Sequence, residues 1–295
     1  MAILHVVGLG SMGLGMALSL LRAGHEVYGL DLTPARVALL QEAGGRALNR
    51  AAPAADALVC VVLNDAQTEA ALFGAEGWAG HLKPGGTILS CATVSPGFAR
   101  RMEALARARG LHYLDAPVSG GAVKAAEGRL SVMASGSPAA FEGAAPALEA
   151  MAQTVHRLAD HAGPGSAMKA VNQLLAGVHI AAMGEAMGFA ASQGLDLARV
   201  LEVIGQSAGT SWMFENRVPH VIAAEYAPRS SIDIWPKDLG IVTDIAQAAN
   251  LPLPVAEAAL SQFRAASEAG LGAEDDAAIA KYVAARAGLR LPGGK

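Results

Sequence analysis

The sequence is poor in charge, in aromatic residues and in cysteine. Charged residues make up 16% and aromatic residues 4% of its 295 positions, and 22 basic against 26 acidic side chains give a net charge of −4. With no basic excess and few aromatic rings, the chain offers little for nucleic acid or for an anionic membrane, so neither is expected as a partner. Hydrophobic residues, at 53%, argue against disorder.

The two cysteines and eight histidines show no spacing typical of metal ligands. Cys60 and Cys91 each lie in an apolar, strand-like run, which favours reduced core thiols in a cytoplasmic protein. No CxxC pair and no HExxH is present, so no metal site is predicted. The first apolar run has no basic segment before it and no cleavage signal after it, and it is interpreted as a strand and not as a signal peptide.

One long apolar run, residues 170–191, is rich in Ala, Leu, Met and Gly. It also contains Asn172, Gln173, His179 and Glu185. A polar group in lipid is costly unless it is paired. The run therefore favours a long helix buried inside a soluble protein over a membrane span.

The two halves of the chain differ in pattern. Up to about residue 162, strand-like runs alternate with helical ones, which predicts an α/β domain with a mainly parallel sheet over residues 1–162. From residue 163 to 295 helical segments follow one another, with 231–235 the one weak strand candidate. The expected strands are 3–7, 26–31, 58–63, 87–91, 112–115 and 130–134; the expected later helices are 166–193, 196–206, 238–249, 254–269 and 273–287.

A glycine-rich turn links the first strand to the first helix. Gly8, Gly10 and Gly13 form a GxGxxG, with Ser11 and Met12 inside it. The first glycine permits the tight turn, the second lets the backbone approach a pyrophosphate, and the third allows close packing of helix on strand. The following helix start favours phosphate binding. This context predicts a dinucleotide site rather than a merely flexible turn.

Asp31 ends the second expected strand, about 20 residues after the fingerprint, where an acidic residue binds the ribose hydroxyls. Its carboxylate would repel the additional phosphate of NADP, so NAD is favoured, although Arg36 lies one helical turn further on. The alternative is a turn or helix-capping role for Asp31. Leu63, Asn64 and Thr93 follow two further strands and are expected to line the same cleft.

Lys169 lies near the start of the long helix, with Asn172 and Gln173 on the same face. A lysine there either extends to solvent or lies in a polar cleft. Burial disfavours the ammonium form, so a buried Lys169 can exchange a proton with a reacting oxygen. Ser119, with the N–H groups of Gly120 and Gly121, is a candidate carboxylate-binding loop; the alternative is a loop chosen for flexibility.

Four segments together resemble the β-hydroxyacid dehydrogenase family, which includes 3-hydroxyisobutyrate dehydrogenase and tartronate semialdehyde reductase. The likeness covers nearly the whole chain. It implies a Rossmann domain joined by a long helix to an all-helical domain, and assembly as a homodimer or homotetramer. The segments are GLGSMGLGMA from Gly8, DAPVSGGAVKAAEG from Asp115, GPGSAMKAVNQ from Gly163 and KDLGIVTD from Lys237.

The resemblance also implies roles for individual residues. Lys169 is the catalytic lysine and Asn172 its supporting amide, and both touch a small hydroxy acid. Lys237 lies near cofactor and substrate, followed by Asp238. The substrate loop is Ser119, Gly120 and Gly121, and the cofactor contacts are Leu63, Asn64 and Thr93. One departure is Cys91-Ala92-Thr93, which replaces the Ser-Thr pair often found before the Val-Ser-Pro turn and leaves Thr93 alone to contact the nicotinamide side.

Within the family, the segments 209–217 and 231–238 look most like the L-threonate dehydrogenases. Trp212, Phe214 and Asn216 are then candidates to shape the substrate pocket, with packing between helices as the alternative for the two aromatic rings. Two rival functions remain. Imine reductases resemble the fold but lack the lysine, and a non-catalytic dinucleotide-binding module would not need the pair Lys169 and Asn172.

Overall fold

The computed structural model describes residues 1–293, and the chain divides into two compact units, residues 1–169 and 170 onward. The division falls inside α7 (Pro164–Ser192), six residues into the helix. The sequence placed the boundary before this helix, near residue 162. The difference arises because the first turn of α7 packs on the strands of the first unit, whereas the rest of the helix packs on later helices.

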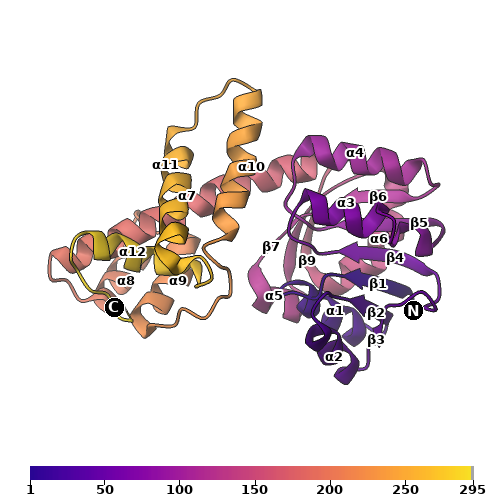
Figure 1. Cartoon of the computed structure of the whole chain (residues 1–295), viewed down its shortest axis with the longest axis horizontal. Coiled ribbons are helices and arrows are strands. Elements are labelled where there is room, and N and C mark those ends of the chain that lie inside the picture. The colour runs from indigo at the N-terminus through magenta and orange to yellow at the C-terminus, as the bar shows by residue number, and fades with distance from the viewer. Residues whose placement is uncertain (294–295) are drawn as a thin grey trace. The chain divides into compact units, whose positions relative to one another are not determined.

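The first unit is an α/β domain (Figure 1). Its elements, in chain order, are β1 (Ile3–Val7), α1 (Gly13–Arg22), β2 (Glu26–Leu30), α2 (Pro34–Glu42), β3 (Arg46–Ala47), β4 (Ala55–Cys60), α3 (Asp65–Phe73), η1 (Ala79–His81), β5 (Leu82–Ser90), α4 (Pro96–Arg107), β6 (His112–Asp115), β7 (Val118–Ser119), α5 (Gly121–Glu127), β8 (Leu130–Ser135), α6 (Pro138–Met151) and β9 (Ala152–Ala159).

Within the described residues, the strands form one nine-stranded sheet in the order β3-β2-β1-β4-β5-β6-β8-β7, with β9 beside β8. The six strands from β3 to β6 pair in parallel, and β8 runs antiparallel to β6 and β7. The prediction of a mainly parallel Rossmann sheet is confirmed. The strand order reverses beside β1, and in open α/β sheets ligands bind at such a reversal, outside the carboxyl ends of the strands.

Helices cover both faces of this sheet, because successive strand residues point to opposite sides. Leu4 and Val6 of β1 pack with α1 and α6 in one core, while Val7 packs with α3 and α4 in another. Three layers result, with buried side chains on each face of the central strands. This arrangement explains why these strands read as continuous apolar runs in the sequence.

The second unit is all-helical, as predicted. After α7 it contains α8 (Leu197–Gly205), α9 (Trp212–Ala223), α10 (Ile234–Ala248), α11 (Pro254–Ala266), η2 (Ser267–Leu271), η3 (Asp276–Ala278) and α12 (Ile279–Arg286). The weak strand candidate at 231–235 was wrong: Ser231 makes one isolated bridge to Asp275, and Ile234 already begins α10. A short apolar run has no period that separates strand from helix.

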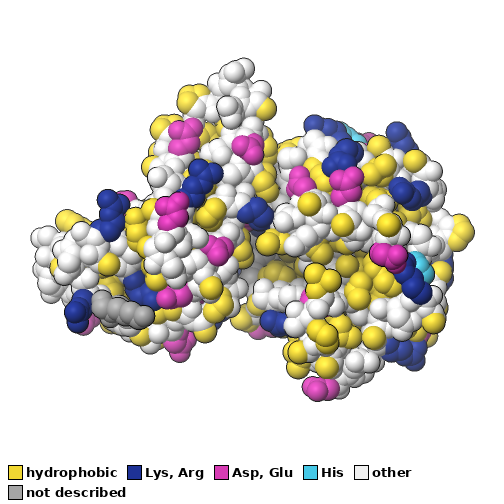
Figure 2. All heavy atoms as spheres, in the orientation of Figure 1, with side chains coloured by type: hydrophobic (Ala, Val, Ile, Leu, Met, Phe, Trp, Pro, Cys, Tyr) yellow, Lys and Arg dark blue, Asp and Glu magenta, His cyan; other side chains and the backbone are white. Residues whose placement is uncertain are grey.

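The long helix α7 forms the centre of the second unit. It is long and apolar enough to cross a membrane by length and composition, yet half of its apolar window is buried within the protein. Ile180, Met183 and Met187 are buried against Leu239 of α10 and Phe263 of α11. The apolar run is therefore explained by helix–helix packing. Charged side chains of both signs are interspersed over the visible face of each unit (Figure 2).

The buried His5 makes folding sensitive to acid. Its ring, on β1, is fully buried, with Nε2 3.1 Å from the carbonyl oxygen of Pro53. Burial lowers the pKa of His5 to about 4, against the opposing hydrogen bond to Pro53. Between about pH 6.5 and 4 the unfolded chain takes up a proton that the folded chain does not. We predict that the free energy of unfolding falls across this window by about 3 kcal/mol from His5 alone.

Urea unfolding at a series of pH values checks this prediction. His5→Gln should remove that part of the loss on acidification, whereas His161→Gln, at a largely exposed ring, should not. Equal pH slopes for the wild type and His5→Gln would show that His5 is not the responsible group.

Candidate functional site

The glycines of the loop between β1 and α1 fall into two groups. A Cβ at Gly13 would lie 1.9 Å from the carbonyl oxygen of Gly8, and one at Gly8 would lie 2.1 Å from that of Val61. A Cβ at Gly10 would meet nothing within 4 Å. Gly8 and Gly13 are therefore required by packing, whereas the space beside Gly10 is open. That open space fits a pyrophosphate that approaches the backbone.

The start of α1 also fits a phosphate. Met12 occupies the N-cap position and no side chain caps the helix. Helix starts leave N–H groups without intrahelical partners, and they carry a partial positive charge that favours anions. Ser11 is exposed beside this helix start. The residues present are therefore suited to hold a dinucleotide at the strand reversal.

Asp31 has a structural role, and its predicted role toward the ribose stays a prediction. Its Oδ2 accepts a hydrogen bond from the backbone N–H of Leu9 (2.7 Å), inside the glycine-rich loop, and its Oδ1 accepts from that of Thr33 (2.8 Å). A carboxylate oxygen accepts more than one hydrogen bond. Asp31 therefore ties β2 to the loop and keeps acceptor capacity for ribose hydroxyls.

Leu63, Asn64 and Thr93 follow β4 and β5, the strands next to β1 on one side. Parallel strands present their carboxyl ends at one edge, so these residues share an edge with the glycine-rich loop. Leu63 is half exposed. Asn64 has a structural role: its Oδ1 accepts a hydrogen bond from the N–H of Gln67 (2.9 Å) and caps α3.

Lys169 lies beside the predicted substrate loop. The residue is buried, and its Nζ donates a hydrogen bond to the carbonyl oxygen of Val118 (2.8 Å), next to Ser119. Gly120 and Gly121 follow with φ of 138° and 78°, a region that favours glycine. Among the predicted site residues, the structure thus brings together Lys169 and the loop 119–121. Of the two options for Lys169, it lies in the interior and does not extend into solvent.

The first turn of α7 is held by two side chains from the sheet. Asp115 and Ser135 are directly paired between β6 and β8. Asp115 Oδ2 accepts from the N–H groups of Gly163 (2.9 Å) and Ser166 (2.8 Å), and Ser135 Oγ accepts from that of Gly165 (2.8 Å). Pro164 has no N–H. Every backbone donor of residues 163–166 therefore has a partner. We call Asp115 and Ser135 the helix anchor.

Two further bonds complete the helix anchor. Ser166 Oγ donates to Asp115 Oδ1 (2.7 Å), and Ser135 Oγ donates to Asp115 Oδ2 (3.2 Å). Burial raises the pKa of Asp115, while the donors from Ser166, Gly163 and Ser135 oppose the rise. A carboxylate at a helix start contributes up to about 2 kcal/mol in partly buried sites, and each buried N–H left without a partner costs about 1–3 kcal/mol. Asp115 is thus a strong local constraint.

A second polar chain lies within the helical unit. Asn172 Nδ2 donates to Gln173 Oε1 (2.9 Å), Gln173 Nε2 donates to Asp238 Oδ2, and Asp238 Oδ1 pairs with Lys237 Nζ (2.6 Å). Gln173 and Asp238 are buried. Four residues from α7 and α10 therefore hold one another in place. The sequence indicated Gln173 only by its spacing and did not predict that it links Asn172 to Asp238.

The predicted pocket-shaping residues of α9 behave differently from one another. Trp212 is half exposed, whereas Phe214 is buried in the core of the helical unit. Asn216 Oδ1 accepts a hydrogen bond from Arg217. Phe214 thus packs between helices, and the substrate role of both rings stays a prediction.

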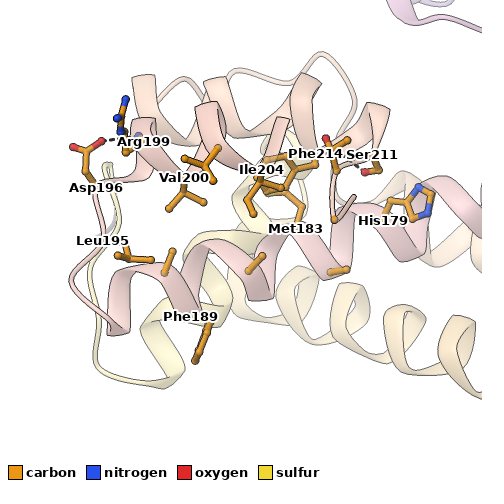
Figure 3. A pocket seen from close by; sticks show the side chains of 16 residues that line it. His179, Met183, Phe189, Leu195, Asp196, Arg199, Val200, Ile204, Ser211 and Phe214 are labelled. Atoms are coloured by element: carbon orange, nitrogen blue, oxygen red, sulfur yellow. Dashed lines mark hydrogen bonds between the residues drawn. The ribbon is translucent and has the colours of Figure 1, made fainter. Parts of the chain in front are cut away.

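Phe214 also lines an apolar groove of about 750 Å³ in the helical unit. In Figure 3, Val200 and Ile204 of α8 point toward Met183 of α7, with Phe214 beside Ile204. His179 lies at one end, and Leu195, Asp196 and Arg199 lie at the other. The groove contains none of the polar residues predicted for catalysis. Its chemistry suits an apolar protein surface better than a hydroxy acid.

The sequence matches two family descriptions. Residues 4–159 match the NAD-binding domain of 6-phosphogluconate dehydrogenase, and residues 163–283 match the NAD-binding domain of NADP-dependent 3-hydroxyisobutyrate dehydrogenase. The chain is similar to L-threonate dehydrogenase of Escherichia coli strain K12, with 49% identity over 98% of this chain and 96% of that protein. It is 47% identical to L-threonate dehydrogenase of Cupriavidus necator, over 98% and 97%.

A solved structure is equally similar. The crystal structure of 3-hydroxyisobutyrate dehydrogenase from Salmonella typhimurium has 49% sequence identity and a TM-score of 0.90, covering 95% of this chain and 99% of that one. Sequence and structure thus agree along nearly the full length of both units.

The two groups of glycines predict opposite consequences of one added methyl group. Gly13→Ala should lower the stability of the protein by about 1–3 kcal/mol through overpacking. Gly10→Ala should leave the melting temperature unchanged and weaken NAD binding about tenfold or more, since the methyl group fills the space for the pyrophosphate. Thermal unfolding and NAD titration of both variants check this. Wild-type NAD affinity in Gly10→Ala would contradict the assignment.

Proposed function

Since the chain belongs to the 3-hydroxyisobutyrate dehydrogenase-like family and is an NAD-dependent hydroxy-acid dehydrogenase, we propose that its substrate is L-threonate. We further propose that Lys169 accepts the proton of the substrate hydroxyl group. The observation that supports the role of Lys169 most is its buried Nζ, hydrogen-bonded to the carbonyl oxygen of Val118 beside the loop 119–121. The choice of L-threonate is supported by the relatives of that name.

The reaction requires a proton and a hydride to leave the substrate alcohol. Neutral Lys169 takes the hydroxyl proton, and in the reverse direction its ammonium returns a proton to the oxygen. Bound NAD⁺ supplies the hydride acceptor, at C4 of its nicotinamide ring. The carbonyl oxygen of Val118 fixes the direction of the Lys169 amine, so that the proton acceptor is in place before the substrate arrives.

The substrate carboxylate is assigned to Ser119 and to the backbone N–H groups of Gly120 and Gly121. Hydrogen-bond donors suit a carboxylate, and the positive φ of both glycines points neighbouring N–H groups in directions that other residues rarely permit. The short separation in sequence between Val118 and this loop brings the carboxylate near the amine. A hydroxy acid fits both requirements at once.

Asn172, one helical turn after Lys169 on α7, is proposed to bind the reacting oxygen. Its amide is oriented by Gln173, which Asp238 holds in turn. Lys237 and Asp238 are proposed as substrate contacts, with Lys237 also toward the cofactor. Trp212 and Phe214 remain candidates for the substrate side chain. Asp31 supports NAD over NADP, because its carboxylate repels a 2′-phosphate.

The test compares initial rates of NAD reduction with L-threonate, D-glycerate and 3-hydroxyisobutyrate, and repeats each with NADP. We expect the highest kcat/KM with L-threonate and NAD, by roughly 10-fold or more, the scale on which a pocket separates substrates that differ by one group. Higher rates with 3-hydroxyisobutyrate would replace L-threonate by that substrate, and higher rates with D-glycerate would favour a tartronate semialdehyde reductase.

Lys169→Ala tests the mechanism in the same assay. The variant should lose about 10²-fold or more in kcat while it keeps wild-type NAD affinity, because the proton acceptor is gone and the dinucleotide loop is untouched. Lys83→Ala, which removes a surface lysine paired with Asp56, is the matched control and should retain full activity. Near-wild-type turnover in Lys169→Ala would remove Lys169 from the mechanism.

Two further properties belong to this proposal. We place the enzyme in the cytoplasm, in keeping with two free, buried cysteines, of which Cys60 has its pKa raised by burial to about 12. We also propose that the protein forms a homodimer or homotetramer. The apolar groove of Figure 3 supports this, because two of its lining residues, Phe189 and Val203, are exposed. A mass of one chain in sedimentation equilibrium would contradict the oligomer.

A further inference from the structure

The position of Lys169 depends in part on contacts made by residues that the proposed reaction does not use. Its Nζ reaches the carbonyl oxygen of Val118 only if the first turn of α7 has the correct position along the helix axis, and the correct rotation about it, relative to β7. Lys169 lies one turn after Ser166, and Ser166 is bound to Asp115 through both its backbone N–H and its hydroxyl. A rigid helix transmits that placement over one turn.

We propose that Asp115 is a positioning residue for the reaction, which acts by fixing the start of α7 so that Lys169 faces the substrate loop. This inference rests on the proposed role of Lys169. Its basis is geometric: one buried carboxylate collects four hydrogen bonds, three of them from residues 163–166, and it lies on the strand that leads directly into Val118 and Ser119. The same residue thus connects the lysine and the loop.

Gly165 provides an independent sign that the contact is tight. A Cβ at this position would lie 2.6 Å from the carbonyl oxygen of Met133 and 2.7 Å from that of Asp115. Backbone atoms of two strands cannot move aside cheaply. The helix start is therefore pressed against the sheet, and Asp115 and Ser135 supply the acceptors at that contact. A shift of the first turn of α7 relative to the sheet would therefore also displace Lys169.

The test uses Asp115→Ala and Asp115→Asn. Alanine leaves the N–H groups of Gly163 and Ser166 without an acceptor, and a small displacement of a catalytic group lowers rates by about 100-fold. We expect kcat to fall by about this factor in Asp115→Ala, with NAD affinity within about twofold of wild type. Asparagine keeps one acceptor oxygen and should restore kcat to within about tenfold. Should Asp115→Ala not fold, Asp115→Asn and Ser135→Ala are measured instead, with smaller losses expected.

A second readout does not depend on turnover. Brief acetylation of the free enzyme with acetic anhydride, followed by mass spectrometry of peptides, measures how readily the Lys169 amine reacts. Loosening its bond to Val118 should speed labelling of Lys169 severalfold in Asp115→Ala and leave labelling of Lys83 unchanged. Asp56→Asn, which removes a carboxylate that binds Lys83 and the N–H of Ile3, is the control for general loss of stability and should change neither kcat nor Lys169 labelling.

The outcomes separate this inference from the proposed function. Wild-type kcat and wild-type Lys169 labelling in Asp115→Ala would overturn the role of Asp115, whatever Lys169 does. Suppose instead that Lys169 is labelled faster in Asp115→Ala and that the separate variant Lys169→Ala keeps full activity. Asp115 would then still anchor the helix, but the reaction assigned to the lysine would be refuted. A parallel fall in kcat and rise in labelling supports both.

Discussion

The buried carboxylate of Asp115 is the contact on which the geometry of the site depends most. A helix start exposes backbone N–H groups that must find partners when they are buried. In α7 these N–H groups face the sheet and not the solvent, and the side chains of Asp115 and Ser135 accept their hydrogen bonds. One interaction therefore satisfies the helix, joins it to β6 and β8, and sets where the lysine one turn later lies.

The cofactor end follows a different logic. Packing alone dictates two of the three glycines in the fingerprint, since any side chain at Gly8 or Gly13 would strike a carbonyl oxygen. Gly10 is the exception, and open space beside it is what a ligand-binding role requires. Asp31 meets a packing requirement and a binding requirement at once. Its carboxylate accepts a hydrogen bond from the N–H of Leu9 and can still accept hydrogen bonds from ribose hydroxyls. Neighbouring residues of this loop are thus constrained either by packing or by ligand binding, and the space around each Cβ position shows which of the two applies.

Much of the fold was predictable from local pattern. The alternation of apolar strands with helices gave the parallel sheet, and the uninterrupted helical segments gave the second unit. The pattern missed β9 (Ala152–Ala159), none of whose residues is buried, and α9, which contains Pro219. The split inside α7 was not predictable, because it depends on which partners the first turn contacts.

Local motifs could single out candidates such as Gly10 and Asp31, and the family resemblance singled out Lys169; their roles stay predictions. Long-range contacts escaped the sequence. Asp115 begins the segment DAPVSGGAVKAAEG, but its hydrogen bonds to Gly163 and Ser166 join positions about fifty residues apart, and no local spacing predicts such a pair. The same holds for Gln173 and Asp238, which meet only because α7 and α10 pack together.

A double-mutant cycle on kcat tests the central claim most directly. It compares the wild type, Asp115→Ala, Lys169→Ala and the double variant, with L-threonate and NAD. If Asp115 acts through Lys169, its removal costs about 100-fold in the wild type and less than about threefold once the lysine is gone, because residues that act as a unit are not additive. Losses that multiply in the double variant would show that Asp115 and Lys169 act independently and would contradict the account.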